Sequence, residues 1–470
     1  MPKAKAKTQE KQNDSEIFHN IVTNQKEFFK TGVTKPAKWR IKQLNKLFST
    51  IKAHEADILQ ALMTDLKKTE FEAYSTEIGI VYSEIRYQKK HVKKWAKTKK
   101  SHGELFAFPA KNLIKPEPFG CTLIMSPWNY PFLLTIDPLV SAIAAGNTAV
   151  LKTSEFSPAT AQVIDNIIKE AFLPEFITTV QGGYIQNQLL LHEHFDFIFF
   201  TGSTNVGKVV MESAAKFLTP VCLELGGKSP CIVDKTANIP VAARRIVWGK
   251  FLNAGQTCVA PDYILVDESI KESLIQAINQ EIQNQYGDNP LTNPELPKII
   301  NSRHFGRLVS LAPDAQTDAA ANKIAPTIMD LGPVNSEAVL NHPVMKEEIF
   351  GPLLPIITFN SLDEVIDFVY HRPTPLALYL FSKNNKTQKK IFNTLRFGGG
   401  CINDVIYQLV SNKLPFGGCG ESGMGSYHGK FGFDTFTHYK GIVKQSSWMD
   451  IKVRYAPHET NIDTVKKFLK

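Results

Sequence analysis

The sequence predicts an α/β fold made of two α/β regions that follow a helical segment. From Lys115 onward, short apolar runs alternate with helical stretches of roughly ten to fifteen residues. Such alternation is typical of right-handed βαβ units, which form a parallel sheet covered by helices on both faces. The chain of 470 residues is too long for one simple core, and its 43% hydrophobic and 21% charged residues are ordinary for a globular protein of two or three domains.

The start of the chain shows two different patterns. Residues 1–15 are rich in lysine and have no apolar periodicity, so we expect them to be disordered. Over residues 16–100, apolar side chains such as Leu59, Leu62 and Leu66 recur at intervals of three to four, which predicts helices.

The first α/β region contains four pairs of a strand and a helix. Its predicted strands are Cys121–Met125, Thr148–Leu151, Ile177–Val180 and Phe195–Phe200, and its helices are Phe132–Ala145, Pro158–Ala171, Gln186–His194 and Val206–Phe217. A second α/β region begins near residue 221, and an alternating stretch near the end predicts an exposed strand over Ser446–Tyr455. The expected divisions are 1–15, 16–220, 221–409 and 410–470.

The formal net charge of +9 comes largely from Met1–Lys11 and Lys89–Lys100. A solvated surface is the simplest interpretation of these lysines, and a weak attraction for anionic cofactors or lipid headgroups is the alternative. No zinc-finger, RNP or aromatic-plus-basic pattern accompanies the charge, so we expect no nucleic-acid partner.

The cysteines and the termini favour a cytoplasmic location. Six cysteines without CxxC pairing argue against a disulfide framework or a metal site. Residues 1–14 lack the apolar region of a secretory signal, and residues 449–470 are too polar for a tail anchor. The most apolar stretch, residues 132–151, is interrupted by Asp137 and Pro138, so we expect a buried helix and strand there and no transmembrane segment.

Polar residues follow three of the predicted strands. In open α/β sheets ligands bind beyond the carboxyl ends of the strands. Asn129 lies in the segment SPWNYP (126–131) after the first strand, and Lys152 and Glu155 follow the second. The turn Thr201–Gly207 leads into a helix, whose free N–H groups can bind an anion. The glycines alone are weak evidence, because tight turns require glycine in any case. Lys152 as a cation and Glu155 as an acceptor for ribose hydroxyls, at the same edge of the sheet, favour dinucleotide binding.

Two residues in the second region have unusual settings. Glu224 ends an apolar strand in front of two glycines, and a buried carboxylate is costly unless it is paired. The simpler interpretation is a solvated acid in a turn. Cys258 lies in the polar turn Gly255–Ala260 after a predicted helix, Ala242–Asn253. Most lone cysteines are inert small hydrophobes, but reactive thiols need the access and polar surroundings that such a turn gives.

Two further turns complete the set of candidate segments. EEIFGP (347–352) offers a carboxylate and an aromatic ring, whereas LPFGGCG (414–420) is most simply a structural turn.

Together these segments resemble the aldehyde dehydrogenase superfamily, over about residues 18–455. SPWNYP, FTGSTNVG, LELGGK, GQTCVAPDY and EEIFGP occur in the family's order and at its spacings. GQTCVAPDY and LPFGGCGESGMGSYHGKFGFDTF look like the class 3, fatty-aldehyde-type branch, although the hydrophobic tail of its membrane-bound members is missing. The resemblance implies a Rossmann-like cofactor domain, a second α/β catalytic domain, a small β oligomerisation arm and a homodimer.

The resemblance also implies roles for single residues. Cys258 matches the nucleophile, Glu224 the general base, and Asn129 the side chain that shares the oxyanion hole with the Cys258 backbone N–H. The implied cofactor contacts are Lys152 and Glu155 at the adenosine ribose, Ser203 between Gly202 and Gly207 at the pyrophosphate, Glu348 and Phe350 toward the nicotinamide, and Ser126 and Trp128 of SPWNYP.

The implied reaction is NAD(P)-dependent oxidation of a medium- or long-chain aliphatic or aromatic aldehyde to the acid, through a thiohemiacetal and a thioester on Cys258. With Glu155 beside the ribose we expect NAD to be preferred and NADP to be accepted. The alternatives are a CoA-acylating enzyme, which generally lacks a base matching Glu224, a cofactor-free hydrolase that uses Cys258, and a non-catalytic relative. The last would be expected to have lost Cys258, Glu224 or Asn129, and all three are present.

Overall fold

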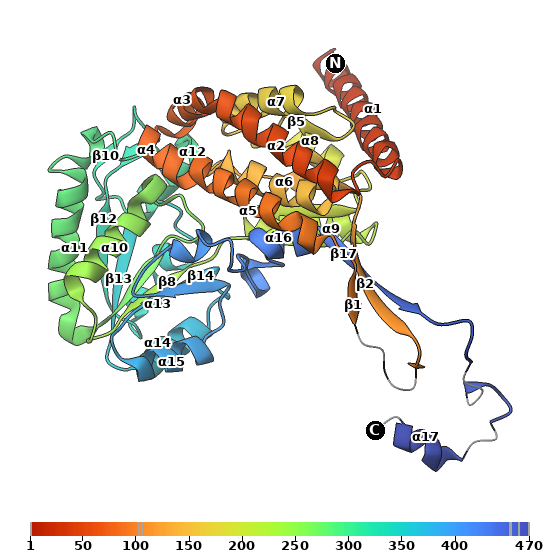
Figure 1. The fold of residues 1–470 in the computed structure, drawn as a ribbon. Coiled ribbons are helices and arrows are strands. Elements are labelled where there is room, and N and C mark those ends of the chain that lie inside the picture. The colour runs from red at the N-terminus through yellow and green to blue at the C-terminus, as the bar shows by residue number, and fades with distance from the viewer. Residues whose placement is uncertain (1, 102–103, 105–106, 451–453, 459–460, 469–470) are drawn as a thin grey trace.

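The computed structural model describes residues 2–101, 104, 107–450, 454–458 and 461–468. Two six-stranded sheets with surrounding helices form the body of the molecule, and an antiparallel arm projects from it (Figure 1).

The first sheet has the strand order β16-β7-β6-β3-β4-β5, and only β16 is antiparallel to its neighbour. The strand order reverses between β3 and β6, and such a switch point is where open α/β sheets bind ligands. Its strands are β3 (Cys121–Met125), β4 (Thr148–Lys152), β5 (Ile177–Val180), β6 (Phe197–Thr201), β7 (Val221–Glu224) and β16 (Gly423–Met424).

Alternate residues of each strand point to opposite faces of the sheet, and both faces are buried in hydrophobic clusters. Leu123 belongs to a core cluster with Phe18 of α1, whereas its neighbour Ile124 belongs to the main cluster on the other face. The helices of this region are α6 (Leu133–Ala145), α7 (Pro158–Ala171), α8 (Tyr184–Leu190), α9 (Thr204–Ala215) and α16 (Gly429–Thr435). The sequence-based ranges for β3, β5 and α7 are confirmed residue by residue.

The N-terminal segment consists of helices, and a π-helical turn, Tyr74–Ile78, separates the last two. The helices are α1 (Pro2–Lys30), α2 (Ala37–Ala53), α3 (Glu55–Leu66), α4 (Glu70–Ala73) and α5 (Gly79–Trp95). The structure differs here from the expectation that residues 1–15 are disordered, since α1 begins at Pro2. Lysine, alanine and glutamine have high helix propensity, and they extend a helix that Phe18 and Val22 anchor on the first sheet.

The second sheet is entirely parallel, with the order β12-β13-β9-β8-β14-β15. Its strands are β8 (Pro230–Val233), β9 (Tyr263–Asp267), β12 (Thr327–Pro333), β13 (Leu353–Phe359), β14 (Ala377–Phe381) and β15 (Gly399–Ile402). The helices around it are α10 (Ile239–Phe251), α11 (Lys271–Tyr286), α12 (Ser302–Leu311), α13 (Glu337–Asn341), α14 (Leu362–Tyr370) and α15 (Asn385–Thr394), and a short hairpin joins β10 (Thr317–Asp318) to β11 (Lys323–Ile324).

The division expected at residue 221 lies a few residues too early. β7 pairs in parallel with β6 and therefore belongs to the first sheet. Residues 225–229 then connect the carboxyl end of β7 to the amino end of β8 in the second sheet. The chain passes between the two sheets immediately after Glu224.

The arm is a three-stranded antiparallel sheet of β1 (Lys99–Ser101), β2 (Lys111–Pro118) and β17 (Thr437–Lys444). The strand predicted at Ser446–Tyr455 is therefore misplaced. Residues 446–450 are not in a strand, and residues 451–453 lie outside the described part of the chain. The observed strand, β17, pairs with β2 along its whole length. The alternation of apolar and polar residues in the sequence does not show which segment makes this pairing. Beyond it, α17 (Ile462–Phe468) lies away from the body (Figure 1). No helix within the described ranges is long and apolar enough to cross a membrane.

Candidate active site

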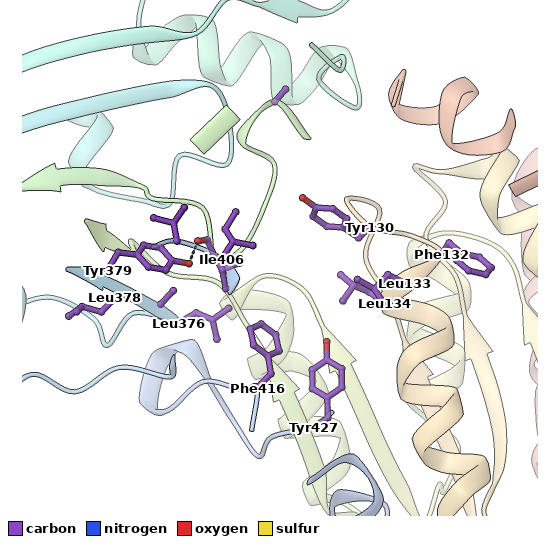
Figure 2. Close-up of a cluster of buried hydrophobic side chains, with 14 of the residues drawn as sticks. Tyr130, Phe132, Leu133, Leu134, Leu376, Leu378, Tyr379, Ile406, Phe416 and Tyr427 are labelled. Carbon is purple, nitrogen blue, oxygen red and sulfur yellow. Dashed lines mark hydrogen bonds between the residues drawn. The ribbon is translucent and has the colours of Figure 1, made fainter. Parts of the chain in front are cut away.

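Cys258 lies on a loop that connects α10 to β9. The loop turns sharply because Asn253 and Ala254 both have left-handed backbone, each with a φ of 52°. Beyond the turn, the Tyr379 hydroxyl donates a hydrogen bond of 2.5 Å to Val259 O, drawn as the dashed line at Tyr379 in Figure 2. The thiol is thus carried by a short loop that is fixed on both sides, and Cys258 itself is partly exposed.

The surroundings of the thiol oppose its ionisation. Although part of the residue is exposed, the surrounding protein keeps water from the thiol and so raises the pKa of Cys258 well above its usual value. The carboxylates of Glu224 and Glu348 raise it further because they disfavour another negative charge nearby. The Glu224 carboxyl group thus lies beside the thiol, whereas Glu348 acts on it through charge alone.

Glu224 is the last residue of β7, and its side chain is buried. Neither carboxylate oxygen has a hydrogen-bond partner among the described residues. Burial raises its pKa to about 7, while the nearby Cys258 thiol and Thr201 hydroxyl favour the charged form. A carboxyl group that titrates near neutral pH beside a thiol is suited to take up and release protons.

Asn129 reaches the same loop from the other sheet. Its side chain is buried, and Nδ2 donates a hydrogen bond of 3.0 Å to the carbonyl of Gln256, two residues before Cys258. The next residue makes a parallel contact, since the Tyr130 hydroxyl and Thr257 Oγ1 are 2.6 Å apart. An amide nitrogen carries two hydrogens, so Asn129 retains one N–H beside the loop.

A cavity of about 570 Å³ leads to Cys258. Its walls are mostly apolar and come from the helical segment, α6 and the loops after β15. Figure 2 shows Tyr130, Leu133 and Leu134 on one side of this space, and Ile406, Phe416 and Tyr427 on the other. Glu72 and His428 are among the few ionisable side chains that also line it.

The carboxyl ends of β4 and β5 form a second candidate site, on the same edge of the first sheet as the switch point. Lys152 is buried there, and its Nζ donates to Thr153 O and Gly182 O at 2.7 and 2.6 Å. Burial lowers the pKa of Lys152 to about 8, and Glu155 partly opposes this shift. The carboxylate of Glu155 is exposed beside Gly183, so a cation and an acceptor lie together at this edge.

The turn after β6 is as tight as its glycines suggest. A Cβ at Gly202 would lie 2.6 Å from the Phe200 ring, and one at Gly207 would lie 2.7 Å from a methyl group of Leu225. Between them, Ser203 caps α9 by accepting a hydrogen bond from Val206 N. The first N–H groups of α9 are therefore left facing the carboxyl edge of the sheet, which suits an anionic group.

The remaining predicted cofactor contacts lie in three places. The rings of Trp128 and Phe350 pack edge to face with centroids 5.4 Å apart. Glu348 packs over Gly226, where a Cβ would lie only 2.1 Å from its carboxylate. Burial and the nearby Asp262 carboxylate raise the pKa of Glu348 to about 8. Ser126 lies at the start of the SPWNYP segment, where its hydroxyl donates to Lys152 O and shares a hydrogen bond with the Thr135 hydroxyl.

Comparison with known proteins identifies the group to which this architecture belongs. The sequence model of a protein family described as "Aldehyde dehydrogenase family" matches residues 4–442. The chain belongs to the aldehyde dehydrogenase family. It is 49% identical over 462 residues to a 4,4'-diaponeurosporen-aldehyde dehydrogenase of Staphylococcus aureus, covering 97% of this chain and 99% of the relative. It is 43% identical over 454 residues to aldehyde dehydrogenase family 3 member A2 of Rattus norvegicus, covering 94% and 92%.

A solved structure leads to the same conclusion. The substrate-bound state of Staphylococcus aureus AldH superposes with a TM-score of 0.93 at 47% sequence identity, covering 96% of this chain and 99% of that one. The expected α/β aldehyde dehydrogenase fold is therefore confirmed, as is the likeness to the family 3 branch. The protein is an enzyme of NAD(P)-dependent aldehyde oxidation, and neither a CoA-acylating nor a non-catalytic relative is favoured.

Sequence reasoning missed several buried polar residues of this aldehyde dehydrogenase. Lys250 is fully buried near Asp262 and Glu348 with no hydrogen-bond partner for Nζ among the described residues, and burial lowers its pKa to about 8. Glu72 and Lys68 lie below the Cys258 loop. Their sequence positions look like ordinary charged residues on a helix, so no local signal distinguishes them. Within the described ranges, no cluster of three or more His, Cys, Asp or Glu side chains could hold a metal ion.

Proposed function

We propose that this enzyme oxidises medium- or long-chain aliphatic or aromatic aldehydes to carboxylic acids, with Cys258 as the nucleophile, Glu224 as the base for hydrolysis and Asn129 as an oxyanion donor. The observation that carries the proposal is the junction at the end of the apolar cavity. There a thiol lies beside a buried carboxyl group and an amide that reaches the same loop.

The first step is attack of the Cys258 thiolate on the aldehyde carbon, because the thiolate is the reactive form. Its raised pKa means that the thiol proton must leave to water or to a base during the reaction. The carbonyl oxygen becomes an oxyanion, and the free N–H of Asn129 is available to bind it. One such donor contributes roughly 3–4 kcal/mol to transition-state stabilisation.

The residues at the carboxyl edge of the first sheet fit a dinucleotide. The N-terminus of α9, with Gly202, Ser203 and Gly207, would hold a pyrophosphate, and Lys152 with Glu155 would hold a ribose. Glu348, Phe350, Trp128 and Ser126 would line the path from there toward Cys258. Bound NAD(P) supplies a hydride acceptor, which leaves a thioester on the cysteine.

Glu224 then activates water for hydrolysis of the thioester, releasing the acid and the free thiol. Its carboxyl group titrates near pH 7, so much of it is available as a base at neutral pH. Its buried oxygens make no hydrogen bond that meets geometric criteria among the described residues, although the Cys258 thiol and the Thr201 hydroxyl lie near them.

The first prediction concerns substrate and cofactor. Formation of NADH and NADPH, followed by absorbance across aliphatic aldehydes of increasing length and aromatic aldehydes, should show the highest kcat/KM for apolar substrates because the cavity walls are apolar. NAD should be preferred and NADP accepted, since Glu155 accepts a bond from a 2′-hydroxyl and repels a 2′-phosphate, whereas Lys152 attracts one. Preference for short polar aldehydes or a strong preference for NADP would contradict these assignments.

A second prediction concerns assembly and location. We propose that the protein forms a homodimer, because the arm exposes Ile114, Ile442 and Val443 on strands that a second copy would cover. We also propose that the protein is cytoplasmic. After centrifugation of a lysate at low and high salt, the protein should remain in the supernatant at high salt and sediment as a dimer in analytical ultracentrifugation. Any lysine-driven adhesion to anionic membranes should be lost as salt rises. A monomer, or salt-resistant recovery with membranes, would contradict the proposal.

A further inference from the structure

Three charged side chains of one short segment are buried against the Asn129 segment and the Cys258 loop. Lys68 and Glu77 are fully buried and Glu72 nearly so. Buried charges are costly unless they are paired and hydrogen-bonded. The reaction proposed above uses none of the three, so their burial calls for another explanation.

Lys68 and Glu77 fix the backbone that carries Asn129. Lys68 Nζ donates to Glu77 Oε1 at 2.6 Å and to Asn129 O at 3.1 Å. The other oxygen of Glu77 accepts from the backbone N–H groups of Phe132 and Leu133 at 2.9 and 3.1 Å, at the start of α6. Glu77 reaches this position from the π-helical turn Tyr74–Ile78, a distortion that is often found at functional sites.

Glu72 makes the corresponding contact with the nucleophile loop. Its Oε1 accepts a hydrogen bond of 2.9 Å from the backbone N–H of Asn253, a residue 181 positions away in the sequence. Asn253 and Ala254 hold left-handed backbone, which is unfavourable for residues other than glycine. The Asn253 side chain then donates to Asn129 O at 2.8 Å and Gln256 O at 3.2 Å. Glu72 therefore bonds to the backbone of Asn253, whose side chain bonds to both the Asn129 segment and the Cys258 loop.

We propose that Glu72 is a positioning residue, which holds the strained turn at Asn253 and thereby sets the Cys258 loop against Asn129. The proposal rests on the proposed function for its catalytic consequence. Glu72 acts through an acceptor oxygen, because its partner is a backbone N–H. A glutamine of the same length should therefore replace it, whereas an aspartate, shorter by one methylene, should not reach.

The test compares E72A, E72D and E72Q with E70A, a control on an exposed glutamate of the same short helix. Two rates are measured in the full-length protein, the NADH burst with decanal and the cofactor-free hydrolysis of p-nitrophenyl acetate, together with the KM for decanal and the Kd for NADH. Misplacement of reacting groups by about 1 Å can cost about 100-fold in rate. In E72A and E72D both rates should fall by about 10- to 100-fold, while the Kd for NADH changes less than about twofold. The KM for decanal is compared with that of E72Q, because Glu72 also lines the cavity. E72Q should stay within about threefold of the wild type.

Several results would overturn the proposal. One is an E72A or E72D rate equal to that of E70A, and another is a loss in E72Q as large as in E72D, which would indicate a role for charge. If E72A does not fold, the comparison of E72D with E72Q decides alone. Absence of NADH formation by the wild type would count against the proposed function instead. Ester hydrolysis, which needs only the thiol and the oxyanion donors, would still decide whether Glu72 positions the loop.

Discussion

Replacement of Cys258 by alanine is expected to lower aldehyde oxidation by more than about a thousandfold while NADH binding stays nearly intact. Without the thiol no thiohemiacetal can form, and removal of a nucleophile can cost up to about 10⁶ in kcat. The cofactor contacts proposed here lie on the first sheet and around Glu348, and alanine at position 258 removes none of them. Steady-state NADH production and fluorescence titration with NADH measure the two effects separately.

Cys419→Ala is the matched control, because Cys419 is also partly exposed but does not line the cavity. Its activity should equal that of the wild type. An alanine variant at position 258 that turns over within tenfold of the wild type would remove Cys258 from its proposed role. Loss of activity that is matched by loss of NADH binding would contradict the expectation that the substitution leaves the cofactor site intact.

Replacement of Glu224 by glutamine should separate the two half-reactions. Glutamine keeps the shape of the side chain but cannot accept a proton from water. The thioester should therefore form and accumulate. Stopped-flow measurements should show a burst of NADH near one equivalent per active site, followed by a slow steady state, and mass spectrometry of the quenched protein should find the acyl group on Cys258.

The pH dependence gives an independent check on Glu224. A general base works in its deprotonated form, and the pKa of Glu224 is raised to about 7 by burial. Steady-state turnover limited by hydrolysis should therefore rise as pH increases through about 7, and E224Q should lack this rise. Glu347→Gln, an exposed glutamate nearby, should keep the wild-type profile. Disappearance of the burst in E224Q would mean that Glu224 acts before hydride transfer, and turnover like that of the wild type would exclude it from the mechanism.

Local sequence patterns were sufficient to predict most strands of the first sheet. Cys121–Met125 and Ile177–Val180 are short apolar runs bounded by turn residues, and Pro158–Ala171 has a proline at its start and an apolar face, so each element could be predicted residue by residue. The helix over residues 2–15 and the strand at Thr437–Lys444 could not be predicted in this way. Residues 2–15 extend α1 beyond the part that Phe18 and Val22 anchor on the first sheet. The strand at Thr437–Lys444 forms because it pairs with β2.

By itself, the sequence determined the α/β class and the candidates Asn129, Glu224 and Cys258, because strand ends and unusual turns are local features. Only the tertiary structure decided that Glu224 lies beside the thiol and that its pKa is near 7, since burial depends on both sheets at once. The same is true of Glu72, whose bond to Asn253 joins segments 181 residues apart. Hydrophobic period and turn chemistry act over a few residues, whereas desolvation, strain and contacts between sheet edges arise only when the chain is packed.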